Sequence, residues 1–187
     1  MLLVRHAESE GNRAACFTPH PEIPITPEGR MQAHAAAARL RAFAPARVVS
    51  SPYLRARQTA HILAEELALR TVHVEDDLRE RSYGALAGLP YATPRPGFDP
   101  ACYWDWRPPG GETLVEVVAR AGAALDRVAA AAAADGHDVV VVSHGAVMLA
   151  LVRHVTGRWG PSRVVPNVGL LVARHDGDAW CGLEVPT

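Results

Sequence analysis

Residues 138–145 read Asp-Val-Val-Val-Val-Ser-His-Gly. Four consecutive valines are typical of a strand that is covered on both faces, because a strand with one wet face alternates apolar and polar residues. The apolar segment that follows predicts a helix at 146–156, which ends at Gly157. We therefore expect the strand at 138–143 to lie in the centre of a sheet, with helices on both sides of it.

Predicted strands and helices alternate along the rest of the chain. Apolar runs rich in β-branched residues predict the strands, and helical periodicity with capping residues predicts the helices. The further strands are expected at 1–4, 47–50, 70–74, 169–174 and 179–185, and the further helices at 27–43, 54–69 and 113–134. This order predicts an α/β fold, a three-layer α/β/α sandwich with a mostly parallel central sheet.

One long segment, residues 84–111, interrupts this alternation. It contains six prolines and five aromatic residues, which predicts an inserted loop or helical excursion rather than a flexible linker. Long ordered excursions often cover functional sites, so we expect this one to lie over the active site. The chain has 187 residues, which fits a single domain spanning 1–187 with 84–111 as a cap-like insertion.

The composition limits the classes of partner and cofactor. Nineteen Lys and Arg against twenty Asp and Glu give a net charge of -1, so no overall basic field favours nucleic acid or an anionic membrane. Cys16, Cys102 and Cys181 are widely spaced, which disfavours a zinc site or a disulfide framework. The first strand begins at Met1 and no apolar run approaches the length of a membrane span. We expect a soluble, cytoplasmic protein without a cofactor or a bound metal.

Polar side chains follow the predicted strands at the points where these strands end. Arg5-His6 ends the first strand, Arg55 follows the second, Glu80 follows the third, and His144 ends the valine strand. Because the carboxyl ends of parallel strands meet at one edge of the sheet, we expect these side chains to lie close together.

The residue types at this edge suit phosphoryl transfer. The planar guanidinium groups of Arg5 and Arg55 could clamp phosphate oxygens, and a neutral imidazole, His6, could attack phosphorus. His144 could donate a hydrogen bond to the same phosphate, and Glu80 could protonate the leaving alcohol. Asn12 could add an amide donor or orient the loop after His6. Other readings remain open, since a strand-end histidine is often structural and Glu80 could pair with Arg79 or Arg81.

Four segments, in order and spread over nearly the whole chain, resemble the histidine phosphatase superfamily, in its branch of phosphoglycerate mutase-like phosphatases. Residues 3–12 read Leu-Val-Arg-His-Ala-Glu-Ser-Glu-Gly-Asn, and residues 51–60 read Ser-Pro-Tyr-Leu-Arg-Ala-Arg-Gln-Thr-Ala. Residues 78–84 read Leu-Arg-Glu-Arg-Ser-Tyr-Gly, and residues 142–145 read Val-Ser-His-Gly. The resemblance implies a metal-independent phosphohistidine mechanism. Its implied residue roles are the phosphate acceptor His6, the proton donor Glu80, and the remaining pocket residues Arg5, Arg55 and His144.

Two positions need attention against this family pattern. Ala7 stands where the family most often has glycine, which is tolerable only if the backbone φ there is negative. Arg57 lies two residues beyond Arg55 and would point to another side of the same helix, so we favour Arg55 as the phosphate ligand.

The segment that should choose the substrate is the excursion, together with the loop at 13–25. The glycolytic mutases of this family use adjacent arginines to hold a second acidic group, whereas Arg95 and Arg107 are separated here. We therefore expect a histidine acid phosphatase-type monoester hydrolase that acts on a small-molecule phosphate ester and resembles broad-specificity or ribazole phosphatases. A cofactor-dependent phosphoglycerate mutase and a non-catalytic phosphate-binding module are the alternatives, and a homodimer is left open.

Overall fold

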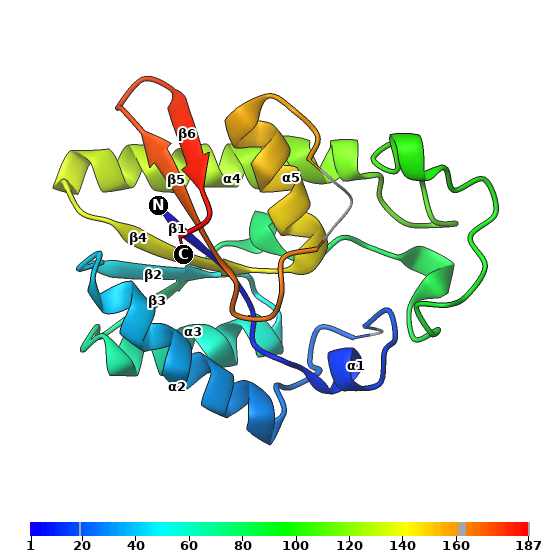
Figure 1. Cartoon of the computed structure of the whole chain (residues 1–187), viewed down its shortest axis with the longest axis horizontal. Coiled ribbons are helices and arrows are strands. Elements are labelled where there is room, and N and C mark those ends of the chain that lie inside the picture. Colours follow the sequence, from blue (N-terminus) through cyan, green and yellow to red (C-terminus); the bar gives the residue numbers. More distant parts are fainter. Residues whose placement is uncertain (19, 161–163, 187) are drawn as a thin grey trace.

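The computed structural model describes residues 1–18, 20–160 and 164–186. Six strands form one sheet, and helices lie on both of its faces (Figure 1). The strands are β1 (Leu2–Arg5), β2 (Arg47–Ser50), β3 (Val72–Val74), β4 (Val139–Ser143), β5 (Leu170–His175) and β6 (Trp180–Glu184). The α-helices are α1 (Glu10–Arg13), α2 (Pro27–Arg41), α3 (Leu54–Glu66), α4 (Leu114–Asp135) and α5 (Gly145–Thr156).

The sheet is mostly parallel, as predicted. Its strand order is β3-β2-β4-β1-β5-β6, with β4 between β2 and β1 in the middle. The four strands from β3 to β1 are mutually parallel, whereas β5 runs antiparallel to β1 and β6 antiparallel to β5. The closing hairpin and the α/β sandwich are therefore both confirmed.

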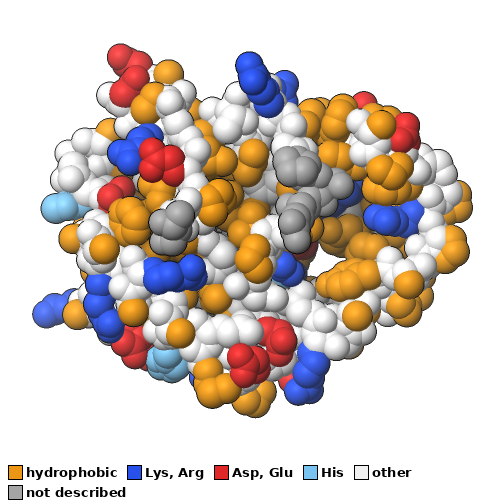
Figure 2. All heavy atoms as spheres, in the orientation of Figure 1, with side chains coloured by type: hydrophobic (Ala, Val, Ile, Leu, Met, Phe, Trp, Pro, Cys, Tyr) orange, Lys and Arg blue, Asp and Glu red, His pale blue; other side chains and the backbone are white. Residues whose placement is uncertain are grey.

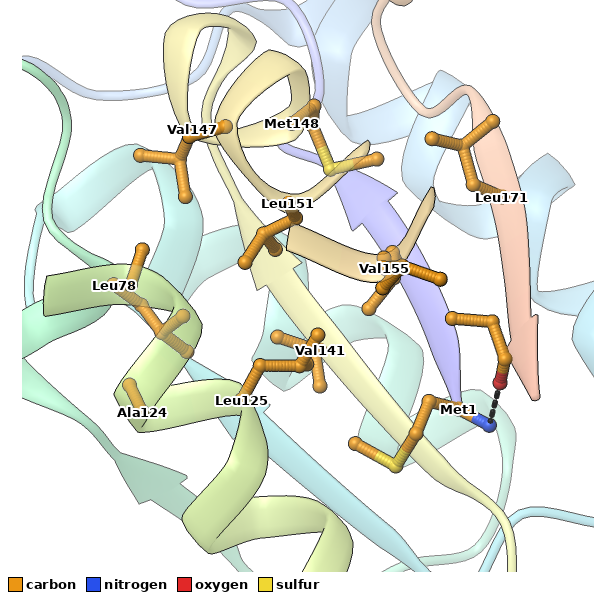
Figure 3. Close-up of a cluster of buried hydrophobic side chains, with 14 of the residues drawn as sticks. Met1, Leu78, Ala124, Leu125, Val141, Val147, Met148, Leu151, Val155 and Leu171 are labelled. Atoms are coloured by element: carbon orange, nitrogen blue, oxygen red, sulfur yellow. Dashed lines mark hydrogen bonds between the residues drawn. The ribbon is translucent and has the colours of Figure 1, made fainter. Parts of the chain in front are cut away.

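The four valines of β4 are divided between the two faces of the sheet. Val140 and Val142 belong to the apolar cluster with α2 and α3, whereas Val139 and Val141 belong to the cluster with α4 and α5. Figure 3 shows Val141 among side chains of α4 and α5. All four valines are at most 1% exposed, which explains why this strand carries no polar residue before Ser143.

Two predicted helices end earlier than expected. The helix predicted at 27–43 ends at Arg41, and the helix predicted at 54–69 ends at Glu66. Ala44 and Ala68, which follow these ends, have positive φ values of 45° and 57°. Left-handed residues commonly terminate helices, and glycine usually takes this position. Alanine carries no such signal in the sequence, so the stops were not visible there.

The excursion from residue 84 to residue 111 forms the loops drawn in green in Figure 1 and contains two short 3₁₀ helices, η2 (Gly84–Leu86) and η3 (Pro100–Cys102). Its two ends are tied together, because Ala85 N–H donates to Pro109 O over 2.9 Å. Gly84 has a φ of +50°, and a Cβ there would lie 2.1 Å from that carbonyl oxygen. Glycine is therefore required where the excursion closes.

Aromatic side chains attach the excursion to the sandwich. Trp104 stacks on Trp159 with a centroid distance of 5.4 Å, and the Tyr103 hydroxyl donates to Gly160 O over 2.9 Å. Tyr103 also packs against Leu114 and Ala146 at the starts of α4 and α5. These aromatics form a small core that holds the excursion beside the sheet edge. Among the described residues, no helix combines the length and the apolar character needed to cross a membrane.

Replacing Leu125 by alanine should lower the free energy of unfolding by about 2 to 5 kcal/mol, because it leaves a cavity between α4 and the sheet. Leu125 is fully buried. Val115, on the same helix, is 47% exposed, and Val115→Ala is expected to change stability by less than about 0.5 kcal/mol. Urea denaturation of both variants measures the difference. Equal losses would contradict the assignment of the buried face of α4.

Candidate active site

Two histidines lie side by side at the carboxyl ends of β1 and β4. Arg5 pairs with Ser143 in the parallel register, and His6 N–H donates to Ser143 O over 2.8 Å. The next residues on the two strands, His6 and His144, therefore leave the sheet at neighbouring points. Their ring centroids are 5.1 Å apart, and both side chains are almost completely buried.

The His6 imidazole has one nitrogen fixed and one available. Its Nδ1 lies 2.7 Å from the carbonyl oxygen of Ala7, which can only accept, so we assign the ring proton to Nδ1. The unprotonated Nε2 then accepts a hydrogen bond from Arg55 Nε over 3.2 Å. Burial lowers the pKa of His6 well below its ordinary value, and the charges of Arg55 and Arg5 lower it further. The ring is therefore neutral, and its unprotonated nitrogen, Nε2, is the one that lies beside Arg55.

Alanine at position 7 causes no backbone strain. Ala7 does not have a positive φ, so it lacks the left-handed conformation that would require glycine. Its N–H donates to Thr59 Oγ1 over 3.0 Å, and its methyl group packs against Ile25, Ala33 and Ile62. The departure from the family pattern thus places a small apolar contact under the loop that follows His6.

Two arginines at this site, the buried Arg55 and the half-buried Arg5, have no carboxylate partner in the described part of the chain. Arg55, on the first turn of α3, is 1% exposed, and Arg5 lies at the end of β1. Within the described residues, neither guanidinium comes within salt-bridge distance of a carboxylate, and Arg5 Nε and Arg55 Nη1 have no hydrogen-bond partner. Burial lowers the pKa of both arginines, while the nearby charge of Glu80 opposes the shift. Such buried charge is costly unless an anion occupies the site.

His144 presents a second donor to the same site. Tyr53 N–H donates to Ser51 Oγ over 3.3 Å, and Ser51 Oγ lies 2.6 Å from His144 Nε2. If Ser51 donates its hydroxyl proton to Nε2, the His144 proton lies on Nδ1. This Nδ1 is buried and has no partner among the described residues. Burial, with Arg55 next in size, lowers the pKa of His144 well below its ordinary value.

Glu80 lies just beyond the 3₁₀ helix η1 (Asp76–Leu78), in a segment without regular secondary structure. Ser143 Oγ donates to Leu78 O over 2.8 Å, which ties this segment to the end of β4. Glu80 does not pair with its neighbours: Arg79 contacts Asp77 and Glu112, and the Arg81 guanidinium donates to backbone carbonyls. The Glu80 carboxylate accepts the Arg81 N–H over 2.9 Å and faces the cavity described below.

The amide of Asn12 orients the loop after His6. Asn12 Oδ1 accepts the Ser9 N–H over 3.2 Å in the capping box of α1, and its Nδ2 donates to the Tyr91 hydroxyl over 3.4 Å. Of the two roles predicted for Asn12, the geometry favours loop orientation, although the residue does border the cavity.

Asn167 is a site residue that the sequence did not reveal. Its Nδ2 donates to His6 O over 2.9 Å and lies 3.2 Å from Asn12 Oδ1. The next residue, Val168, has a φ of +50°, which is unfavourable for a β-branched side chain. Such strain is concentrated at functional sites. A single asparagine in a loop offers no pattern that could have singled it out beforehand.

These groups open into one cavity of about 830 Å³. Five of the six predicted residues line it, namely Arg5, His6, Asn12, Arg55 and Glu80, while His144 is not part of the lining and its ring centroid lies 5.1 Å from that of His6. Arg57 is not part of the lining, and its Nη2 lies 3.6 Å from Glu22 Oε2. In Figure 2 the surface is hollowed between the α/β sandwich and the excursion, and hydrophobic side chains border the hollow. The aromatic members of the lining are Phe17, Tyr53, Tyr83, Tyr91, Phe98, Tyr103 and Trp106.

The described residues contain no group of three or more His, Cys, Asp or Glu side chains arranged to hold a metal ion. The charges that face a ligand at the His6 end of the cavity are those of the arginines and of Glu80. This arrangement can bind a phosphoryl group, offer it a neutral nucleophile and supply a carboxyl group at the cavity wall.

Comparison with known proteins identifies the same family along the whole chain. A family model for the histidine phosphatase superfamily (branch 1) matches residues 1–183. An uncharacterised phosphatase of Bacillus subtilis, PhoE, is 32% identical over 157 residues, covering 84% of this chain and 77% of PhoE. A 2,3-bisphosphoglycerate-dependent phosphoglycerate mutase of a Methylobacterium species is 35% identical over 168 residues, covering 84% and 80%. The structure of a mycobacterial glucosyl-3-phosphoglycerate phosphatase with VO3 superimposes with a TM-score of 0.82 at 25% identity, covering 100% and 97%.

The lowered pKa values of His6 and His144 predict a loss of stability in acid. Below about pH 6.5 the unfolded chain binds protons that the folded site refuses, so the free energy of unfolding falls as the pH falls. Each such histidine contributes up to about 1.4 kcal/mol per pH unit. His144→Gln should reduce the slope by about this amount, measured by urea denaturation at several pH values. The exposed His137, replaced by Gln, is the control, and an unchanged slope in His144→Gln would show that folded His144 is protonated.

Proposed function

The chain belongs to branch 1 of the histidine phosphatase superfamily, and we propose that it hydrolyses a small-molecule phosphate monoester through a phosphohistidine formed on His6. One observation carries this proposal. The unprotonated Nε2 of His6 lies 3.2 Å from Nε of the buried Arg55, the half-buried Arg5 borders the same cavity, and neither guanidinium has a carboxylate partner among the described residues. A phosphate dianion would offset both charges and bring phosphorus next to the nucleophile.

The first step transfers the phosphoryl group to the enzyme. Arg5, Arg55 and the Nδ1–H of His144 would hold the non-bridging oxygens and stabilise the charge that develops on them. The lone pair of His6 Nε2 forms the new P–N bond while the bond from phosphorus to the ester oxygen breaks. Glu80 gives its proton to that oxygen, so the alcohol leaves in neutral form.

The second step returns the enzyme to its starting state. Glu80, now a carboxylate, takes a proton from water, and the water oxygen attacks phosphorus as the P–N bond breaks. Inorganic phosphate leaves, and the electron pair returns to His6 Nε2. Neutral His6 is essential at the start of each cycle, because a protonated ring has no lone pair for attack. Its burial beside two arginines meets this requirement.

The outer part of the cavity favours an alcohol with apolar or ring-shaped surface. Its aromatic side chains come from the excursion, from Tyr53 and from Phe17, and they offer flat faces rather than charges. The two arginines of the excursion do not form a pair for a second acidic group. Arg107 binds Glu116 over 2.7 Å, and Arg95 lies over the Phe98 ring at 4.0 Å. These contacts support a phosphatase over a mutase.

A phosphoglycerate mutase is the second candidate, because a relative with that name is 35% identical. An assay with a mixture of 3-phosphoglycerate and 2,3-bisphosphoglycerate distinguishes phosphatase activity from mutase activity. A phosphatase releases inorganic phosphate from esters, whereas a mutase forms 2-phosphoglycerate without net release. Efficient isomerisation without phosphate release would replace the proposal. A panel of sugar, nucleoside and polyol phosphates, with glucosyl-3-phosphoglycerate included, would then narrow the substrate.

The proposal predicts hydrolysis of p-nitrophenyl phosphate with and without EDTA, because none of the steps above uses a metal ion. Acid quenching during turnover of a ³²P-labelled ester should trap an acid-labile phosphoenzyme. His6→Ala should abolish both the adduct and the turnover, since the proposed nucleophile is then absent. A labelled adduct that persists in folded His6→Ala protein would assign the nucleophile to another residue.

Arg55→Ala should lower the rate about 10- to 150-fold, because a charge-assisted hydrogen bond is worth roughly 1.5 to 3 kcal/mol in the transition state. Arg57→Ala is the matched control on the same helix, and we expect its rate within about twofold of wild type, since Arg57 does not line the cavity. The kcat for p-nitrophenyl phosphate measures both. A larger loss of kcat in Arg57→Ala than in Arg55→Ala would make Arg57 the phosphate ligand.

A further inference from the structure

Arg120, on α4, is a buried arginine directed at the segment that carries Glu80. Its side chain is 11% exposed. Nη1 donates to Asp77 O over 2.7 Å and to Arg79 O over 2.8 Å, and Nη2 lies 3.3 Å from Glu80 O. One guanidinium thus binds three backbone carbonyls within four residues of chain.

Glu112 holds the guanidinium of Arg120 from the other side. Arg120 Nε donates to Oε1 over 2.9 Å and Nη2 donates to Oε2 over 2.8 Å, a bidentate pair. The same Oε2 accepts the Ser82 N–H over 2.8 Å. Burial alone would raise the pKa of Glu112, but the hydrogen bonds from Arg120 and Ser82 outweigh it and the pKa is lowered. Glu112 is therefore charged, and it binds the backbone N–H of Ser82, two residues after Glu80.

Side-chain and backbone hydrogen bonds, rather than secondary structure, fix the Glu80 segment: the Arg81 guanidinium donates to Glu112 O and Trp106 O, and the Glu112 N–H donates to Ser82 O over 3.0 Å. Among the described residues, Arg120 is the group that binds the Glu80 carbonyl itself. Residues 79–83 belong to no helix or strand, so no regular ladder sets the position of the Glu80 backbone. Arg120 binds the carbonyls up to Glu80, and Glu112 binds the N–H of Ser82, so the pair clamps Glu80 from both sides along the chain. His6 and His144, in contrast, leave the sheet directly from β1 and β4.

We propose that Arg120, held by Glu112, is a positioning residue that sets the distance between the Glu80 carboxyl group and the leaving oxygen. This inference rests on the proposed role of Glu80 as proton donor. A displacement of about 1 Å in such a group can cost on the order of 10²-fold in rate. Lysine at position 120 keeps the charge but offers a single ammonium group, which cannot bind Glu112 in bidentate form and reach three carbonyls together.

The test compares two leaving groups through kcat/KM, which contains only the steps up to release of the alcohol. An alkyl alkoxide needs the proton from Glu80, whereas p-nitrophenolate is stable without it. Arg120→Lys should lower kcat/KM for an alkyl phosphate such as β-glycerophosphate roughly 10- to 100-fold. The value for p-nitrophenyl phosphate should fall by less than about threefold. A loss of folding alone would lower both values by the same factor.

Arg127→Lys is the matched control. Arg127 is on the same helix, and it binds the Glu75 and Asp77 side chains over 2.9 and 3.0 Å, but it is 53% exposed and binds no backbone carbonyl of the Glu80 segment. We expect both substrates to react at the wild-type rate in this variant. If Arg120→Lys does not fold, Glu112→Gln loosens the same clamp without changing the size of the side chain, and the same selective loss is expected.

The Glu80→Gln variant distinguishes a failure of the positioning inference from a failure of the proposed function. If Glu80→Gln loses alkyl ester hydrolysis selectively while Arg120→Lys behaves like Arg127→Lys, the positioning role is overturned and the proposed function stands. If Arg120→Lys lowers kcat/KM for both substrates by the same factor, Arg120 is only structural and the inference is again overturned. If Glu80→Gln hydrolyses both esters at the wild-type rate, the acid role of Glu80 itself is wrong.

Discussion

The site depends on the parallel pairing of β1 with β4. This pairing places Arg5 opposite Ser143. The residues that directly follow these two strand ends are His6 and His144, which leave the sheet at its carboxyl edge. Because the four valines of β4 are buried on both faces, the register between these two strands cannot slip without moving apolar side chains. The spacing of 5.1 Å between the two imidazole rings is thus set by the core of the sheet.

The surroundings of this pair divide into a rigid part and a clamped part. His6, His144 and Arg55 are held by strand ends and by the first turn of α3, and each is at most 2% exposed. Glu80 lies on irregular backbone and takes its place from the Arg120–Glu112 pair. In the proposed mechanism, phosphate binding and nucleophilic attack would therefore use core-supported groups, whereas proton transfer would use a group whose position side chains determine.

Local pattern predicted most of the elements, and its errors have local causes. The strand expected at 47–50 is β2 with the same bounds, since its flanking residues and apolar run are unambiguous. The ends of α2 and α3 were missed because alanines, rather than glycines, take the left-handed positions at 44 and 68. Arg55 and Arg57 were separable in advance by helical geometry, and the structure puts only Arg55 in the cavity lining.

The sequence by itself determined which polar residues follow which strands, because the period of apolar residues reveals strand ends and parallel strands end at a common edge. Of the six residues predicted for the site, five line one cavity. Only the tertiary structure decided that the His144 ring lies 5.1 Å from the His6 ring, that Asn167 holds the His6 carbonyl and that Arg120 binds the Glu80 backbone. These contacts join residues 40 to 161 positions apart and lack any repeating period, so they exist only once the chain has packed.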